Sequence, residues 1–218
     1  MFANLKTSII NRYKSFIFNR ILRGFSKLNF TEMTDIETIS KLYYYFGNCG
    51  WSAKPEYLLT CIKYAIDCNG PILELGSGLS TLIIGIIAKK KNIEMTSLEN
   101  DLKWGDNIIK LIDKYKLDNI VIINPLKDYG EYEWYNPDFK KTPSFNLVIC
   151  DGPPSKTKGG RYGFLPIMKE SLSLGAVIIV DDTIRIEERD IIKRWAEIIE
   201  FDEIQFKNNS PHSVLILR

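Results

Sequence analysis

Short apolar runs rich in isoleucine and valine alternate with longer helical patterns from residue 71 onward. Runs of this kind are typical of a parallel sheet whose crossover helices bury both of its faces. The predicted strands cover residues 71–76, 94–99, 119–124, 145–151, 175–181, 200–206 and 212–217. Helices are expected at about 79–90, 102–116, 164–173 and 187–199. The pattern therefore predicts an α/β fold with a seven-stranded sheet and helices on both faces.

The connection between the last two predicted strands differs from the others. It runs from Phe206 to His212 through a short polar link that ends in Pro211, and it is too short to hold a crossover helix. The last two strands should therefore pair antiparallel. The result is a Rossmann-like, mostly parallel sheet with an antiparallel last strand, an ending that a dinucleotide-binding Rossmann domain does not normally have.

The charge is distributed unevenly along a chain of otherwise ordinary composition. Among 218 residues, 45% are hydrophobic and 26% charged, which suits one globular domain. A net charge of +2 is too close to neutral to favour a nucleic-acid partner. The first 31 residues nevertheless hold six basic side chains and no acidic one. We therefore expect a domain over residues 51–218, preceded by a basic extension over residues 1–50.

The basic extension has the pattern of an amphipathic helix. Its apolar side chains recur at helical spacing, while lysine and arginine mostly occupy other faces; the apolar positions are Phe2, Leu5, Ile9, Tyr13, Phe16, Ile17, Ile21, Phe25 and Leu28. Such a helix can cover its own catalytic domain, pack on a second subunit in a homodimer, or lie on an anionic membrane surface. The sequence leaves these three alternatives open.

The cysteines and the hydropathy pattern bear on the location of the protein. Cys49, Cys61, Cys68 and Cys150 form no CxxC pair, and three of them lie in apolar stretches, which indicates reduced thiols. No stretch approaches the roughly 20 apolar residues of a membrane span. Basic residues also interrupt the one candidate for a signal-peptide core. We expect a soluble cytoplasmic protein, with any peripheral membrane contact at the inner face.

The segment from Ile72 to Thr81, ILELGSGLST, is the most informative about a ligand. A buried strand runs into Gly76 and Gly78, which let the backbone turn tightly and approach a ligand beneath the positive end of the next helix. Thr81 stands where the dinucleotide fingerprint has its third glycine. Glu74 would repel a pyrophosphate but attract the ammonium of a methionine moiety. These two residues favour an amino-acid-bearing nucleoside.

A second acid, Glu99, ends the second predicted strand in Ser97-Leu98-Glu99-Asn100. A carboxylate at this place can accept hydrogen bonds from both ribose hydroxyls. NAD enzymes use the same device, so Glu99 indicates a ribose without identifying the nucleoside. The structural alternative is a solvated acid at the end of a strand.

Several motifs occur in one order along the chain: Glu74 to Thr81, Ser97-Leu98-Glu99, Pro125-Leu126, Trp134-Tyr135, Asp151-Gly152-Pro153-Pro154, Arg161, and Gly175 to Asp182. Together they resemble the class I S-adenosylmethionine-dependent methyltransferases, particularly a bacterial branch in which the Asp-Gly-Pro-Pro turn and the Asp-Asp strand end occur together. The resemblance covers about residues 51–218. It implies a Rossmann-like fold and S-adenosylmethionine as the cofactor.

The resemblance also assigns a cofactor-binding set: Glu74, Gly76, Ser77, Gly78, Ser80, Thr81, Glu99, Asn100, Leu126 and Asp151. The methionine end would lie at the glycine turn and the ribose at Glu99. The adenine would meet the segment after the third strand, where many members carry an acid and this chain has Leu126. Leu126 is then expected to supply apolar contact, with Asp128 or Trp134 as the polar or stacking partner.

Three acids should converge at the carboxyl edge of the sheet, where ligands of open α/β sheets lie. Asp151 ends the fourth predicted strand, and Asp181 and Asp182 end the fifth. Three close carboxylates repel one another unless a cation or a basic substrate group lies between them. The arrangement resembles the Mg²⁺ site of the catechol-type O-methyltransferases, with Asp182 at the usual amide position. As alternatives, Asp182 caps the next helix and Asp181 accepts from loop amides.

The predicted catalytic set is Asp151, Asp182, Arg161 and His212. Arg161 ends a loop over residues 152–161 that is rich in glycine and basic residues, lacks phosphate-loop spacing and is expected to cover the site. Its lysines are expected to meet an anionic acceptor or to be solvated. His212, the only histidine, is either a general base or a turn residue. Trp51, ahead of a helix expected from Pro55 to Cys68, can close over the cofactor or pack between helix and sheet.

The sequence thus predicts an enzyme that transfers the methyl group of S-adenosylmethionine to a small-molecule or glycan acceptor, with a hydroxyl oxygen favoured and a divalent metal as a possible assistant. An NAD-dependent oxidoreductase shares the glycine turn and Glu99 but is disfavoured by Glu74, Thr81 and the terminal antiparallel pair. An aminopropyl transferase would use a decarboxylated cofactor, whereas Glu74 suits the complete methionine moiety. A silent methyltransferase-like scaffold is the non-enzymatic alternative.

Overall fold

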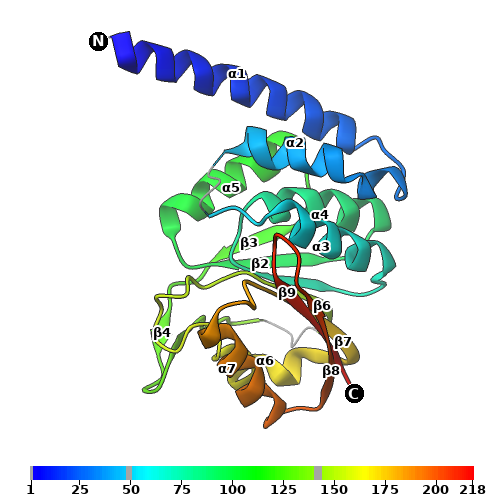
Figure 1. The fold of residues 1–218 in the computed structure, drawn as a ribbon, viewed down its shortest axis with the longest axis vertical. Coiled ribbons are helices and arrows are strands. Elements are labelled where there is room, and N and C mark those ends of the chain that lie inside the picture. The colour runs from blue at the N-terminus through cyan, green and yellow to red at the C-terminus, as the bar shows by residue number, and fades with distance from the viewer. Residues whose placement is uncertain (1, 48–50, 140–143) are drawn as a thin grey trace.

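The computed structural model describes residues 2–47, 51–139 and 144–218, with the backbone alone described for residues 2–9. A central sheet lies between two layers of helices (Figure 1). Its strands are β1 (Ile72–Leu75), β2 (Met95–Glu99), β3 (Ile120–Ile123), β6 (Phe145–Cys150), β7 (Leu172–Asp181), β8 (Phe201–Phe206) and β9 (His212–Leu217). The strand order is β3-β2-β1-β6-β7-β9-β8.

The strand directions confirm the predicted sheet. The strands β3, β2, β1, β6 and β7 run parallel to one another. Strand β9 lies between β7 and β8 and is antiparallel to both. The short link after β8 brings Phe206 opposite His212, because a connection of this length can only fold back on itself. The last strand in the sequence therefore lies inside the sheet and not at its edge.

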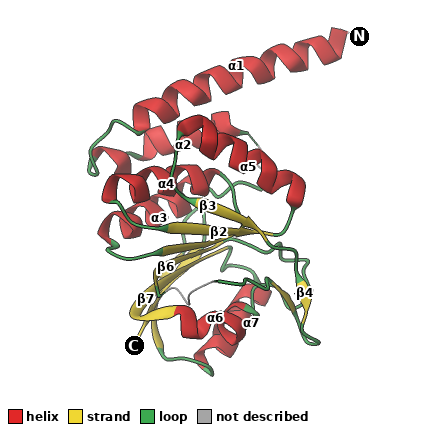
Figure 2. Cartoon of the chain, turned by 180° about the vertical axis from the view of Figure 1, so that it is seen from behind, coloured by secondary structure: helices red, strands yellow, loops and turns green. Residues whose placement is uncertain are grey.

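The helices lie on both faces of the sheet, as predicted. They are α1 (Phe2–Phe25), α2 (Ile36–Phe46), α3 (Pro55–Asp67), α4 (Leu79–Lys91), α5 (Leu102–Tyr115), α6 (Phe164–Met168) and α7 (Ile186–Ala196), with short 3-10 turns at Glu32–Thr34 and Lys169–Ser171. Figure 2 shows α3, α4 and α5 on one face, with α2 and α1 stacked outside them, and α6 and α7 on the other face. Each face has its own hydrophobic cluster.

One predicted helix ends early, and a two-stranded ribbon and helix α2 were not predicted. The helix predicted over residues 164–173 ends at Met168, and β7 begins at Leu172 because this residue pairs with Phe145 across a register irregularity. A two-stranded ribbon, β4 (Lys127–Asp128) and β5 (Glu133–Trp134), was not predicted, since strands of two residues carry no periodic signal. Helix α2 begins after Asp35, whose carboxylate accepts from the backbone N–H groups of residues 37 and 38.

The carboxyl-terminal half of α1 belongs to the body of the protein. Phe18, Leu22 and Phe25 are buried in the same hydrophobic cluster as α3 and α4, and the Phe18 ring lies 5.4 Å from that of Phe46. The amino-terminal half projects beyond α2 (Figures 1 and 2). Within the described residues, no helix has the length and apolarity needed to cross a membrane.

Three cysteines are described, and none is in a disulfide: Cys61, Cys68 and Cys150. Cys61 and Cys150 are buried, as expected for thiols that pack as small apolar groups. Cys49 lies outside the described residues.

Candidate active site

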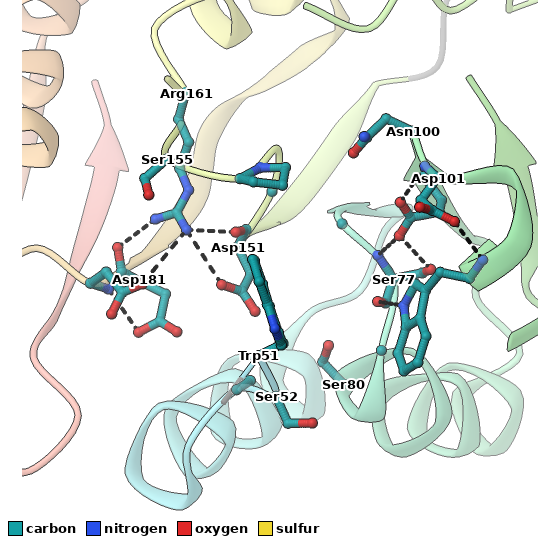
Figure 3. Close-up of a pocket in the computed structure, with 18 of the residues that line it drawn as sticks. Trp51, Ser52, Ser77, Ser80, Asn100, Asp101, Asp151, Ser155, Arg161 and Asp181 are labelled. Atoms are coloured by element: carbon teal, nitrogen blue, oxygen red, sulfur yellow. Dashed lines mark hydrogen bonds and ion pairs between the residues drawn. The ribbon is translucent and has the colours of Figure 1, made fainter. Parts of the chain in front are cut away.

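A cavity of about 880 Å³ opens at the carboxyl edge of the sheet. It is lined by the turns that follow β1, β2, β6 and β7 and by residues 51–54 ahead of α3 (Figure 3). This is the edge where open α/β sheets bind ligands, because the strand ends and the amino ends of the following helices meet there. The polar residues of interest therefore come from four separate turns.

The two glycines after β1 have different physical roles. Gly76 has a φ of +84°, and a Cβ on it would lie 2.9 Å from the backbone nitrogen of Gly152. It is therefore required by its left-handed backbone and by the contact between the turns after β1 and β6. A Cβ on Gly78 would meet nothing within 4 Å, and this residue lines the cavity. Bare backbone at Gly78 thus leaves room for a ligand.

Glu74 lies beneath the glycine turn and not in the cavity. It is fully buried, and its Oε2 accepts hydrogen bonds from the hydroxyls of Thr81 and Ser97, each at 2.6 Å. Thr81 Oγ1 in turn accepts from the backbone N–H of Gly78 at 2.7 Å. Burial raises the pKa of the Glu74 carboxyl to about 7, although the hydroxyl donors oppose this shift.

These contacts correct two predictions. Glu74 and Thr81 support the glycine turn from below, whereas the sequence placed both against the cofactor. The physical reason is that β1 is covered on both faces, so the Glu74 side chain enters the interior beneath α4. Glu74 therefore does not select an ammonium group over a pyrophosphate by touching the ligand, which was the basis of the sequence argument.

Glu99 lines the cavity and joins two of its turns. Its Oε2 accepts from the backbone N–H and the hydroxyl of Ser77, at 2.9 and 2.7 Å, and its Oε1 accepts from the Asp101 N–H at 2.8 Å. The Trp104 indole donates to the Ser77 carbonyl at 2.7 Å. A carboxylate offers about four acceptor positions, and these three bonds leave about one of them on Glu99 for a ligand hydroxyl. Figure 3 shows this cluster opposite the acidic side of the cavity.

The residues predicted to meet an adenine do not line the cavity. Leu126 is half-buried against the cluster beneath α6 and α7, where Trp134 is fully buried. The Asp128 carboxylate pairs with Lys158 at 3.3 Å. These predictions are wrong about location, because the chain turns away after β3 into the β4–β5 ribbon. The cavity wall next to Glu99 is formed instead by three residues: Asn100, Asp101 and Trp104.

The structure brings together Asp151, Asp181 and Asp182, as expected from the strand ends. One oxygen from each lies within 4.8 Å of the others. Burial raises the pKa of Asp181 well above its usual range, and the charges of Asp151 and Asp182 raise it further. Burial also raises the pKa of Asp151, while Arg161 opposes the shift. Asp181 does accept from a loop amide, the Asp182 N–H at 2.8 Å, whereas Asp182 does not cap α7, because the N-cap position is held by Arg185, without a side-chain hydrogen bond.

Arg161 fastens the ends of β6 and β7 to each other. It is 2% exposed and donates to the backbone carbonyls of Asp151 and Asp181, at 2.5 and 2.6 Å. Its guanidinium also lies 3.4 Å from the Asp151 carboxylate and 4.0 Å from that of Asp182. On the opposite side it meets the buried Glu188 of α7 at 3.5 Å. Arg161 therefore holds the acids in position, and Figure 3 shows it between the two strand ends.

Two residues of this site were not found from the sequence. Glu188 lies in the first turn of α7, where acids are common, so nothing marked it as the partner of Arg161. Lys54 precedes α3 and lines the cavity with Lys156 and Arg185. Arg185 pairs with Asp182 at 2.9 Å. Positively charged side chains therefore lie at the rim of the cavity, close to the acidic residues.

His212 is a structural residue and not a cavity residue. It is fully buried, with Nδ1 2.5 Å from the Ser210 carbonyl and Nε2 2.8 Å from the Thr60 hydroxyl. Its ring stacks on Phe206 at 4.5 Å, and burial lowers its pKa. The predicted role as a general base is therefore corrected. Trp51, in contrast, is 71% exposed and lines the cavity, so it can cover a ligand (Figure 3).

Comparisons with known proteins identify the fold. No protein-family model and no curated protein sequence matches the chain. Among solved structures, the S-adenosylhomocysteine-bound methyltransferase PaMTH1 of Podospora anserina matches with a TM-score of 0.60 at 15% identity, over 84% of this chain and 87% of the other. This is a Rossmann-like methyltransferase fold.

Two further structures support the same fold. The O-methyltransferase of Bacillus cereus, also in complex with S-adenosylhomocysteine, has a TM-score of 0.55 at 14% identity, over 84% of this chain and 90% of the other. The carboxyl-terminal domain of precorrin-6Y C5,15-methyltransferase from Rhodobacter capsulatus has a TM-score of 0.52 at 15% identity, over 78% and 92%. Such distant likeness establishes the fold and leaves the reaction to be argued from the site.

Proposed function

We propose that this protein is an S-adenosylmethionine-dependent methyltransferase that acts on a hydroxyl group of a small molecule or glycan. The observation that carries the proposal is the insertion of β9 between β7 and β8 in the sheet. The cavity opens at the carboxyl edge of this sheet. A dinucleotide-binding sheet has its sixth strand directly beside the fifth. The solved methyltransferases with this fold include two bound to S-adenosylhomocysteine, the product left after methyl transfer.

The turn after β1 and the end of β2 would bind the cofactor. Gly78 offers bare backbone to the methionine end, and Glu99 offers its remaining acceptor position to a ribose hydroxyl. The residues next to Glu99 replace Leu126 as candidates for the adenine side. The proposed set is Gly76, Ser77, Gly78, Ser80, Glu99, Asn100, Asp101, Trp104 and Asp151, all of which line the cavity.

The acid cluster would bind the acceptor side through a divalent cation. Oxygens of Asp151, Asp181 and Asp182 within 4.8 Å of one another fit the hard oxygen ligands that Mg²⁺ prefers, as in the catechol-type enzymes that the sequence resembles. A bound Mg²⁺ would lower the pKa of an acceptor hydroxyl. Arg161 would keep the carboxylates in place, and Trp51 would exclude water above the reacting groups.

The reaction itself is a displacement at carbon. The acceptor oxygen forms a bond to the sulfonium methyl, the C–S bond breaks, and its electron pair remains on the sulfur of S-adenosylhomocysteine. The hydroxyl proton passes from the acceptor to water. The role of the protein is therefore to align the oxygen with the methyl group and to stabilise the oxygen as it loses its proton.

Calorimetry with S-adenosylhomocysteine and with NAD tests the cofactor. We expect binding of the first and not of the second, and binding of NAD alone would overturn the proposal in favour of an oxidoreductase. Transfer of labelled methyl from S-adenosylmethionine to fractions of small molecules and glycans then tests turnover. Binding without transfer to any fraction would favour the silent scaffold.

Chelation tests the metal. We expect the labelled transfer to stop with a chelator and to return with Mg²⁺. The variants Asp151→Asn and Asp182→Asn should stay inactive with added Mg²⁺, whereas Asp190→Asn, an exposed acid in α7, should match the unchanged protein. Rates that resist the chelator would rule out the metal while leaving the methyltransferase proposal intact.

A further inference from the structure

The exposed face of α1 carries large apolar side chains that the body of the protein does not cover. Ile10, Tyr13 and Phe16 are 53%, 60% and 63% exposed. Phe18 and Leu22 anchor the helix on its opposite side. The exposed aromatic residues are therefore held outward by a helix whose carboxyl-terminal half is part of the core.

Arginines share this outward face with the aromatic residues. With 3.6 residues per turn, the side of α1 opposite Phe18 and Leu22 presents Phe16 and Arg20, with further exposed residues on either flank. Among the described side chains of α1, those of Arg12, Tyr13, Phe16, Arg20 and Arg23 are exposed on this side. We name this set the outer face of α1.

The chemistry of the outer face indicates its partner. The first 31 residues contain six basic side chains and no acidic one, so the partner must supply negative charge. Aromatic rings between arginines suit the boundary between lipid headgroups and acyl chains, where the rings enter the apolar layer and the guanidinium groups meet phosphates. A second copy of the chain would present the same face in a two-fold dimer and would bring arginine against arginine.

We infer that the outer face of α1 binds an anionic lipid surface and holds the catalytic domain at the membrane. Binding combines attraction of Arg12, Arg20 and Arg23 to the headgroups with insertion of Tyr13 and Phe16. It does not depend on the cofactor or on the acceptor. The inference therefore stands independently of the proposed methyl transfer.

Sedimentation with vesicles tests this inference on the full chain. Deleting α1 is unsuitable, because Phe18, Leu22 and Phe25 belong to the core. We expect the protein to sediment with vesicles of phosphatidylcholine mixed with phosphatidylserine, to remain in solution with phosphatidylcholine alone, and to be released by salt. Each arginine replaced by glutamine should weaken binding roughly fivefold.

Two variants separate the contributions, and each has a matched control. The first, Tyr13→Ser with Phe16→Ser, should lose binding, whereas Leu174→Ser, at a residue that is 88% exposed on β7, should bind like the unchanged protein. The second, Arg12→Gln with Arg20→Gln, should bind roughly 25-fold more weakly, whereas Lys193→Gln in α7 should not.

Four outcomes would overturn the inference. Equal binding to neutral and mixed vesicles would remove the role of lipid charge. Absence of binding to the mixed vesicles, or binding unaffected by both outer-face variants, would remove the surface itself. A dimer in light scattering that Tyr13→Ser with Phe16→Ser abolishes, without vesicle binding, would assign the face to a second copy of the chain.

Discussion

Replacing the buried Glu74 by glutamine should remove part of the pH dependence of folding stability. The pKa of this carboxyl is about 7 in the folded protein against an ordinary value of 4.5. Since one pKa unit corresponds to about 1.4 kcal/mol, ionised Glu74 lowers the free energy of unfolding by about 3 kcal/mol. The folded state binds this proton more tightly than the unfolded chain. The stabilisation of the fold by protonated Glu74 is therefore complete below about pH 4.5 and is lost as the pH rises to about 7.

Glutamine imitates the protonated form of Glu74. Its carbonyl oxygen can accept from the hydroxyls of Thr81 and Ser97, as Oε2 of Glu74 does. Its amide nitrogen would replace Oε1, which is buried without a hydrogen-bond partner among the described residues. An unpaired amide lowers the free energy of unfolding of the variant by about 1–3 kcal/mol at every pH. It therefore does not change how this free energy depends on pH.

The measurement is urea unfolding followed by circular dichroism between pH 4.5 and pH 8, together with calorimetry of S-adenosylhomocysteine. Across this range we expect the unchanged protein to lose about 3 kcal/mol more stability than Glu74→Gln, because only the former titrates at this site. Affinity for S-adenosylhomocysteine should change only a few-fold. Parallel stability curves would refute the reasoning. Parallel curves with a loss of affinity of about 100-fold would instead restore the contact with a ligand ammonium that the sequence suggested.

Other substitutions test the remaining contacts. Arg161→Met should lower the free energy of unfolding by about 3–5 kcal/mol, because it leaves buried carboxylates unpaired; an unchanged urea midpoint would contradict this. Gly76→Ala should reduce stability, since it adds a Cβ at positive φ against Gly152, while Gly78→Ala should keep its stability and bind S-adenosylhomocysteine more weakly; equal behaviour of the pair would show that the glycines share one role. His212→Gln should lower the melting temperature and leave the methyl-transfer rate of the folded enzyme unchanged, and a lost rate at full stability would return His212 to catalysis.

The sequence by itself determined the sheet and the place of the site. Strand periodicity is a local property, and the short link before His212 permits only an antiparallel return. Because parallel strands end at one edge, Asp151 and Asp181 could be expected to meet without any knowledge of their contacts. These predictions succeeded because they needed only residue spacing and the direction of the chain.

The tertiary structure decided which side chains face the cavity. Glu74 and Glu99 both belong to buried strands, yet one enters the interior beneath α4 and the other ends its strand at the cavity. The position of Leu126 depends on the path of the chain after β3, and the burial of His212 depends on its distant partner Thr60. The pairing of Arg161 with Glu188 likewise joins separate elements. Exposure and charge pairing arise from packing between segments that are far apart in the sequence, so local sequence patterns cannot predict them.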